Sequence, residues 1–199
     1  MAYDLDRHVA IMHGGWSHTR LNDQTWEFDS ATATWSQRSS GIPSARYHST
    51  LAYDSSQHVS LLYGGTDGVA SGEIWAWNGS KWTTSASTPP PHVNHSLAYD
   101  SQRGVTVMFG GSQISDLWEW DGASWQWRTN EGPPAREKGG MAFDNARGNT
   151  VLFGGATFDA VALGDTWLWN ANEWSLSSGA APSPRFDHSM TFDAARGVV

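Results

Sequence analysis

The side chains that could do chemistry are concentrated in four links, each of which contains a proline. Pro43, Pro89, Pro133 and Pro182 are each followed three residues later by an arginine or histidine, and more histidines and charged residues follow. Guanidinium and imidazole groups hydrogen-bond acidic or hydroxyl-rich ligands. The links therefore predict a polar, partly cationic rim formed by Arg46, His48, His92, His95, Arg136, Lys138, Arg185, Asp187 and His188.

Two other interpretations of these residues stay open. An arginine that recurs at one repeat position can hydrogen-bond backbone carbonyls of a neighbouring sheet instead of a ligand. His48, His95 and His188 lie at or next to one repeat position, and a metal site would need such groups to converge from different repeats. Nothing in the sequence indicates that convergence, so we predict no metal site and no cofactor.

A second group of candidates lies outside the repeated positions. Trp16, His18 and Arg20 follow a double glycine, and Phe158 and Asp159 lie in the corresponding connection further along the chain. An exposed tryptophan beside polar groups suits a sugar face or a protein hot spot, and the alternative is a loop folded over the next sheet. The predicted ligand-binding set is Trp16, His18, Arg20, Arg46, His48, His95, Arg136, Arg185 and His188.

The elements that must position these side chains are copies of one repeat. The copies open at Met1, Leu51, Leu97, Met141 and Met190, at intervals of 50, 46, 44 and 49 residues. In the four full copies the opening Asp precedes the first glycine of a Gly-Gly pair by ten residues. Alternating apolar residues bounded by Gly, Asp and Asn predict four short strands in each copy, and the constant spacing predicts an invariant hairpin.

The repeated motifs resemble those of the kelch repeat. A Gly-Gly pair ends a hydrophobic strand, and an aromatic-x-aromatic-Asp/Asn strand follows, as in WEFDSATATW, WAWNGSKW, WEWDGASW and WLWNANEW. A P-x-x-R link then leads to the next copy. The resemblance covers essentially the whole chain and implies an all-β, kelch-type β-propeller built from four-stranded antiparallel blades.

The resemblance also implies how the chain is divided. One propeller domain spans residues 1–199, with four full blades at about 1–50, 51–96, 97–140 and 141–189 and the start of a fifth at 190–199. Kelch-like rings generally have more than four blades, so we expect a partial ring. Its exposed blade edges would allow self-association, either as an open arc or as two copies joined into a larger ring.

Most of the tryptophans are expected to be core residues. Large aromatic side chains at fixed strand positions pack sheet against sheet. Trp127 is expected to extend a strand, and the opening aspartates are expected to bond their own turn backbone. The eleven core tryptophans occupy three repeat positions: Trp26, Trp75, Trp118 and Trp167; Trp77, Trp120 and Trp169; and Trp35, Trp82, Trp125 and Trp174.

Strand order predicts which end of each sheet carries a ligand. In an up-and-down sheet the turns between strands one and two and between three and four share one end. The connections between strands two and three share the other end with the links, and nearly all of the length variation is found there. Because loops carry function on a fixed scaffold, we expect the ligand at this second end.

Composition excludes several classes of function. A net charge of −8 disfavours a sequence-independent nucleic-acid binder, and no apolar run approaches the roughly 20 residues of a membrane span. No signal peptide is visible, although Met1 occupies a repeat position. An earlier start, with secretion or a periplasmic location, therefore stays open. Two lysines against ten arginines indicate a high-GC bacterial source.

The absence of cysteine bears on catalysis. Galactose oxidase resembles this architecture and implies a tyrosine–cysteine cofactor, which a chain with no cysteine cannot form. Sialidases imply an arginine trio, but Arg46, Arg136 and Arg185 all hold one repeat position. We therefore predict a non-catalytic module that binds a protein segment or glycan. The alternatives are a structural part of a larger propeller, or a propeller enzyme of oxidase or sialidase type.

Overall fold

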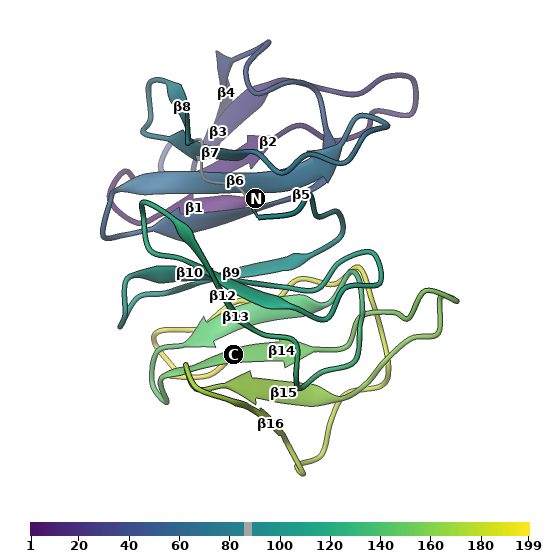
Figure 1. The fold of residues 1–199 in the computed structure, drawn as a ribbon. Coiled ribbons are helices and arrows are strands. Elements are labelled where there is room, and N and C mark those ends of the chain that lie inside the picture. Colours follow the sequence, from purple (N-terminus) through teal and green to yellow (C-terminus); the bar gives the residue numbers. More distant parts are fainter. Residues whose placement is uncertain (86–88) are drawn as a thin grey trace. The chain divides into compact units, whose positions relative to one another are not determined.

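The fold is built from β-strands throughout the part of the chain that the computed structural model describes, residues 1–85 and 89–199. Sixteen strands form four four-stranded sheets in these residues, which contain no helix. Accordingly, no described segment is a helix of the length and hydrophobicity that a bilayer crossing requires. The chain divides into two compact units, unit 1 (Met1–Val93) and unit 2 (Asn94–Val199), with two sheets in each (Figure 1).

Unit 1 contains sheets 1 and 2. Sheet 1 consists of β1 (Ala2–Asp4), β2 (Val9–His13), β3 (Thr25–Asp29) and β4 (Thr34–Ser39). Sheet 2 consists of β5 (Tyr47–Asp54), β6 (Val59–Thr66), β7 (Ile74–Trp77) and β8 (Trp82–Ser85).

Unit 2 contains sheets 3 and 4. Sheet 3 consists of β9 (Ser96–Asp100), β10 (Val105–Phe109), β11 (Leu117–Trp120) and β12 (Trp125–Thr129). Sheet 4 consists of β13 (Gly140–Asp144), β14 (Asn149–Phe153), β15 (Thr166–Trp169) and β16 (Trp174–Leu176).

Every sheet has the same topology. Each strand pairs antiparallel with the next strand in the chain, so the order in space is the order in sequence. The predicted all-β fold with four four-stranded antiparallel sheets is therefore confirmed. The arrangement of these sheets as blades around an axis stays a prediction.

The opening aspartate of each repeat makes the first turn. One carboxylate oxygen accepts the N–H groups of the second and third following residues, at 2.9–3.1 Å in all five copies. This is the local bonding that makes Asp favourable in turns. The structural role expected for Asp4, Asp54, Asp100, Asp144 and Asp193 is confirmed.

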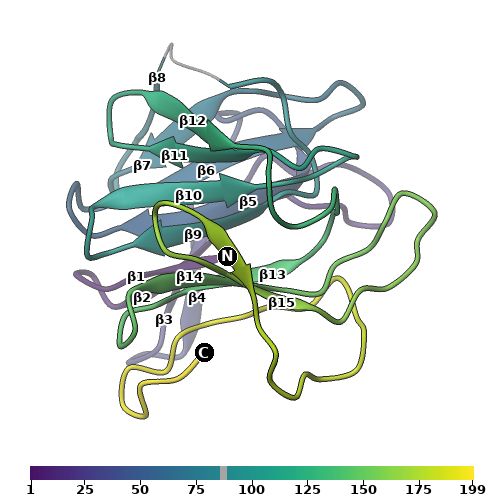
Figure 2. The ribbon, with the colours of Figure 1, turned by 60° about the horizontal axis from the view of Figure 1, so that its bottom comes forward.

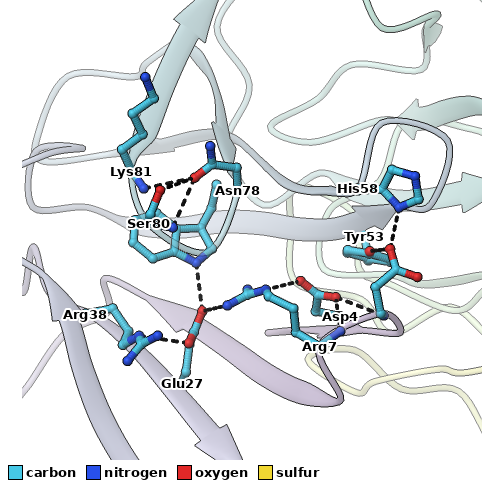
Figure 3. A network of polar contacts seen from close by, with 11 residues as sticks. Asp4, Arg7, Glu27, Arg38, Tyr53, His58, Asn78, Ser80 and Lys81 are labelled. Atoms are coloured by element: carbon cyan, nitrogen blue, oxygen red, sulfur yellow. Dashed lines mark hydrogen bonds and ion pairs between the residues drawn. The ribbon is translucent and has the colours of Figure 1, made fainter.

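A buried glutamate joins the two sheets of each unit. In unit 1, Glu27 on β3 accepts the indole N–H of Trp77 on β7 at 2.8 Å. It also pairs with Arg7 and Arg38 of its own sheet, at 2.6 and 2.9 Å (Figure 3). In unit 2, Glu119 on β11 accepts the indole N–H of Trp169 on β15 at 2.9 Å. Both units therefore contain the same link between neighbouring sheets.

The hydrophobic core of each unit lies between its two sheets. In unit 1, Ile11 of sheet 1 packs with Leu62, Trp77 and Trp82 of sheet 2. In unit 2 the buried cluster again draws on both sheets and consists of Ala98, Val107, Phe109, Leu117, Met141, Leu152 and Trp169. Large aromatic and aliphatic side chains on facing sheet surfaces form such a core.

The prediction that eleven tryptophans belong to the core is correct with one clear exception. Trp77, Trp120 and Trp169 are 1–4% exposed, and most of the other eight are at least half-buried. Trp35 is 44% exposed, so the prediction is wrong for this residue. Its ring lies 5.2 Å from Phe28 on the same sheet, whereas the equivalent Trp82 reaches Thr25 on the neighbouring sheet. Trp127 extends β12, as expected.

The last ten residues repeat the opening turn. Asp193 makes the same carboxylate-to-backbone bonds as the earlier copies, and a single bridge joins it to Val198. This segment therefore contains the same turn as the other copies, and a fifth blade stays a prediction.

Candidate ligand-binding site

The Gly-Gly pairs fix the end of each sheet where a ligand is expected. The first glycine of every pair donates its N–H to the residue before the third strand, at 3.1–3.3 Å. The second donates its N–H to the carbonyl of Arg46, His92, Arg136 or Arg185, at 2.7–3.1 Å. The connection between strands two and three and the following link therefore meet at one end of each sheet, as predicted.

Only glycine fits the first position of these pairs. Gly14 has φ +71°, and a Cβ there would lie 2.5 Å from the backbone oxygen of Arg46. Gly154 has φ +64°, and its Cβ would lie 2.5 Å from the oxygen of Arg185. This close approach lets the link pass directly beside the sheet.

Arg46 and Arg136 join neighbouring sheets within their units. Arg46 donates from Nη1 to the carbonyl of Gly64 at 3.1 Å and from Nη2 to Glu73 at 2.9 Å. Arg136 donates to the carbonyl of Gly154 at 3.1 Å and to both carboxylate oxygens of Asp165, at 2.6 and 2.8 Å. Both arginines are 2% exposed. These contacts give them the structural role left open above, so we place the ligand on more exposed groups.

The carboxylates that receive these arginines stay charged. Hydrogen bonding from Arg46 holds the pKa of Glu73 below its usual value, and Arg136 does the same for the pKa of Asp165. Charge-assisted bonds to a carboxylate favour its ionised form.

Arg185 occupies the same place in sheet 4 but has a different environment. Its carbonyl accepts the N–H of Gly155, and its side chain bonds the backbone and hydroxyl of Ser183, at 3.0 and 2.8 Å. Unlike Arg46 and Arg136, it is exposed.

The predicted histidines are spread over both units. In unit 1, His48 is exposed on β5, with its ring 4.4 Å from that of Tyr47. In unit 2, His95 is 3% exposed, and His188 packs edge-on against Phe153. Burial lowers the pKa of His188. Within residues 1–85 and 89–199, no three His, Cys, Asp or Glu side chains are grouped so that they could hold a metal ion.

The loop that carries Trp16 is a small hairpin of its own. Trp16 bridges Leu21, and Ser17 donates its N–H to the carbonyl of Arg20 at 2.9 Å. The hairpin leaves the Trp16 side chain 61% exposed, and His18 and Arg20 are exposed at its tip. The Trp16 ring lies 6.3 Å from the ring of Tyr47, the residue that follows Arg46. The structure thus brings two predicted elements together, the Trp16 loop and the first link.

A hollow of about 340 Å³ opens beside this link, between it and the connection from β6 to β7. We call it the β6–β7 hollow. The polar side chains in its wall are those of Ser44, Arg46, Thr66, Asp67, Ser71 and Glu73. Apart from Arg46, the sequence analysis did not single them out. The available signal was the length of the segment between the Gly-Gly pair and the third strand, TDGVASGE in sheet 2 against SQISD in sheet 3.

Long connections also extend from unit 2. The segment between β14 and β15 projects beyond the ends of its strands and carries Phe158 and Val161, 75% and 60% exposed (Figure 2).

A buried histidine that the sequence analysis missed lies behind the first link. His13 is 7% exposed, and its Nδ1 lies 3.0 Å from Thr25 Oγ1, which accepts the indole N–H of Trp82 at 2.8 Å. Thr25 Oγ1 accepts from Trp82 and keeps its own proton, which it can donate to an unprotonated Nδ1 of His13. Burial, reinforced by the charge of Arg46, lowers the pKa of His13 to about 4.

Comparison with known proteins adds no family to this description. No protein-family model matches the chain, and no curated protein sequence matches it.

Proposed function

We propose that this chain is a kelch-type β-propeller section that acts as a non-catalytic binding module. It takes a protein segment or a glycan at the end of the sheets where the links and the connections between strands two and three meet. The observation that carries this proposal is the exposed Trp16, which lies beside Tyr47, the residue that follows Arg46 in the wall of the β6–β7 hollow. Exposed aromatic side chains next to polar groups are typical of recognition surfaces.

The propeller part of the proposal is supported by the repetition of contacts between sheets. Glu27–Trp77 and Glu119–Trp169 are equivalent hydrogen-bonded pairs. Arg46 and Arg136 donate hydrogen bonds to equivalent glycine carbonyls. The contacts between sheets 1 and 2 therefore recur between sheets 3 and 4. Recurrence of this kind is what a propeller of similar blades would have.

The non-catalytic part is supported by what the arginines do. A sialidase-like site would need guanidinium groups directed at a substrate, but Arg46 and Arg136 are buried and bonded to protein carbonyls and carboxylates. Their donors serve the scaffold, which favours binding over hydrolysis.

The proposal predicts that the Trp16 loop carries binding energy. On a combined glycan and peptide array, Trp16→Ala should weaken the bound ligand by about tenfold or more, because it removes an exposed aromatic contact. Arg20→Ala and His48→Ala should weaken it less. Thermal unfolding should be unchanged, since all three side chains are exposed.

Trp127→Ala is the matched control, because Trp127 is 54% exposed and lies within a strand, β12. It should bind as the wild type does. Unchanged binding by Trp16→Ala, Arg20→Ala and His48→Ala together would remove this site.

A second candidate is a purely structural section of a larger assembly. It is favoured by Arg185, which has the backbone bond of Arg46 and Arg136 but leaves its guanidinium exposed. A further sheet offering a glycine carbonyl and a carboxylate would complete its contacts. Light scattering tests edge-to-edge self-association directly. A concentration-dependent mass would support it, and a stable monomer would count against it.

A further inference from the structure

We propose that the β6–β7 hollow holds one uncharged sugar residue of a glycan, with Trp16 alongside. This inference rests on the proposed binding function and narrows its ligand to a neutral polyol. The charge of the hollow, its available hydrogen-bonding atoms, its size and the nearby aromatic pair support it.

The charge of the hollow disfavours anionic ligands. Arg46 and Glu73 are ion-paired at 2.9 Å and neutralise each other, which leaves the Asp67 carboxylate as the net charge of the wall. A phosphate, uronate or sialate would therefore meet a negative wall whose single guanidinium is already paired. Ligands without a negative charge remain.

The hollow offers two carboxylate oxygens as acceptors. Arg46, Ser71 and Trp75 all donate to Oε2 of Glu73, and none of them to Oε1. Asp67 accepts the N–H of Val69 on Oδ1 at 3.2 Å, which leaves Oδ2 for a ligand. Each of these oxygens can accept a ligand hydroxyl.

The same wall offers hydroxyl protons as donors. Ser44 Oγ accepts from Arg46 at 3.1 Å, and Thr66 Oγ1 accepts the N–H of Gly68 at 2.9 Å. A hydroxyl that accepts one bond still has its own proton to donate. The wall therefore presents both acceptors and donors.

This combination favours a sugar over a basic peptide side chain. Lysine and arginine side chains carry donors only, so they would satisfy Asp67 and Glu73 but leave the protons of Ser44 and Thr66 without acceptors. Each sugar hydroxyl both donates and accepts, and therefore suits both sets of atoms.

Size and aromatic contact agree with a single sugar residue. A volume of about 340 Å³ lies at the lower end of the roughly 300–1,000 Å³ of small-molecule sites. Two residues of the wall, Arg46 and Thr66, are the chain neighbour and the cross-strand partner of Tyr47, whose ring lies 6.3 Å from that of Trp16. The exposed Trp16 ring offers an apolar face to the C–H groups of a sugar.

The test is an NMR titration of the ¹⁵N-labelled chain with small probes. The neutral probes are methyl glycosides of glucose, galactose, mannose and N-acetylglucosamine. The charged probes are glucuronate, N-acetylneuraminate and N-acetyl-lysine amide. At least one neutral glycoside should shift the amides of 44–47 and 66–73, and the charged probes should not.

Asp67→Asn tests the acceptor while keeping the bond to Val69. It should weaken the bound glycoside about tenfold, as expected when a hydrogen bond from ligand to carboxylate is lost. The control is Asp159→Asn, a change of the same type on the exposed β14–β15 connection, which should bind normally. Glu73 is left intact because its loss would leave the buried Arg46 unpaired.

Three results would overturn the inference. In the first, no neutral glycoside shifts the amide signals of 66–73 at concentrations up to about 50 mM. In the second, only a charged probe binds. In the third, Asp67→Asn binds the glycoside with the affinity of the wild type. If the array ligand depends on Trp16 but not on Asp67, the binding module stands and the sugar site falls. An array with no ligand for the wild-type chain would instead remove the binding module itself.

Discussion

Replacement of Glu119 by alanine should lower the free energy of unfolding by about 3 kcal/mol. Its side chain is about 5% exposed and receives Arg103 on both oxygens, at 2.7 and 3.0 Å, together with the indole N–H of Trp169. Arg128 completes the set at 3.4 Å. Removal of the carboxylate leaves the buried indole without an acceptor and takes away the carboxylate partner of Arg128. Arg103 loses one of its two carboxylates and keeps Asp100, at 2.6 Å. This loss lies at the lower end of the range for breaking a buried ion pair, because the side chains of Arg103 and Arg128 are partly exposed.

Urea unfolding of the variant measures this loss. Glu131→Ala, in an exposed turn of the same unit, is the matched control and should stay within about 0.5 kcal/mol of the wild type. Glu119→Gln should fall between the two, because it keeps an acceptor for Trp169 but loses the charge. A loss below about 1 kcal/mol in Glu119→Ala would show that the contact does not hold the two sheets together.

The second large effect is a loss of stability in acid that depends on His13. The pKa of His13 is about 4 in the folded chain, whereas an unfolded histidine titrates near 6.5. The fold therefore requires the neutral His13 ring, and the stability that depends on this ring is fully present above pH 6.5. It declines as the pH falls from 6.5 towards 4, by about 3 kcal/mol in total.

His13→Phe isolates this contribution. Phenylalanine already occupies the equivalent positions 109 and 153, so it suits the repeat. Between pH 7 and pH 4 the wild type should lose about 3 kcal/mol more than His13→Phe, measured by urea unfolding. His18→Gln, a change at an exposed histidine, should follow the wild-type profile. Parallel profiles for wild type and His13→Phe, or an imidazole NMR midpoint near 6.5, would contradict the assignment.

The sequence predicted those parts of the fold that depend on neighbouring residues. The turn at Asp54 needs only the amides of the next residues, and the hairpin between β5 and β6 follows from alternating apolar positions. The meeting of the Gly-Gly pair and the link also followed, because strand order alone puts them at one end.

Features that depend on a contact with a residue distant in the sequence could not be predicted in this way. The role of Arg46 stayed open because its acceptors, Gly64 and Glu73, belong to the next repeat. Glu119 was missed because its repeat position also holds Ala76 and Leu168, so no pattern marks it. Trp35 was wrongly placed in the core because the same repeat position does not have the same contacts in every sheet. Trp82 contacts the neighbouring sheet, whereas Trp35 contacts Phe28 of its own sheet.

The candidate site was only partly accessible from the sequence. Trp16 was singled out because it lies outside the repeated positions, and the structure leaves it exposed. The β6–β7 hollow was missed because its wall combines a link with a connection that is about twenty residues away. Only the fold brings Ser44 and Asp67 to one cavity.

The glutamate–tryptophan pairs join the sheets of this chain in twos. Within each unit the first sheet supplies the carboxylate and the second supplies the indole that it needs. A change in length by a whole pair of sheets would keep each of these glutamates with its indole, whereas a change by a single sheet would separate them.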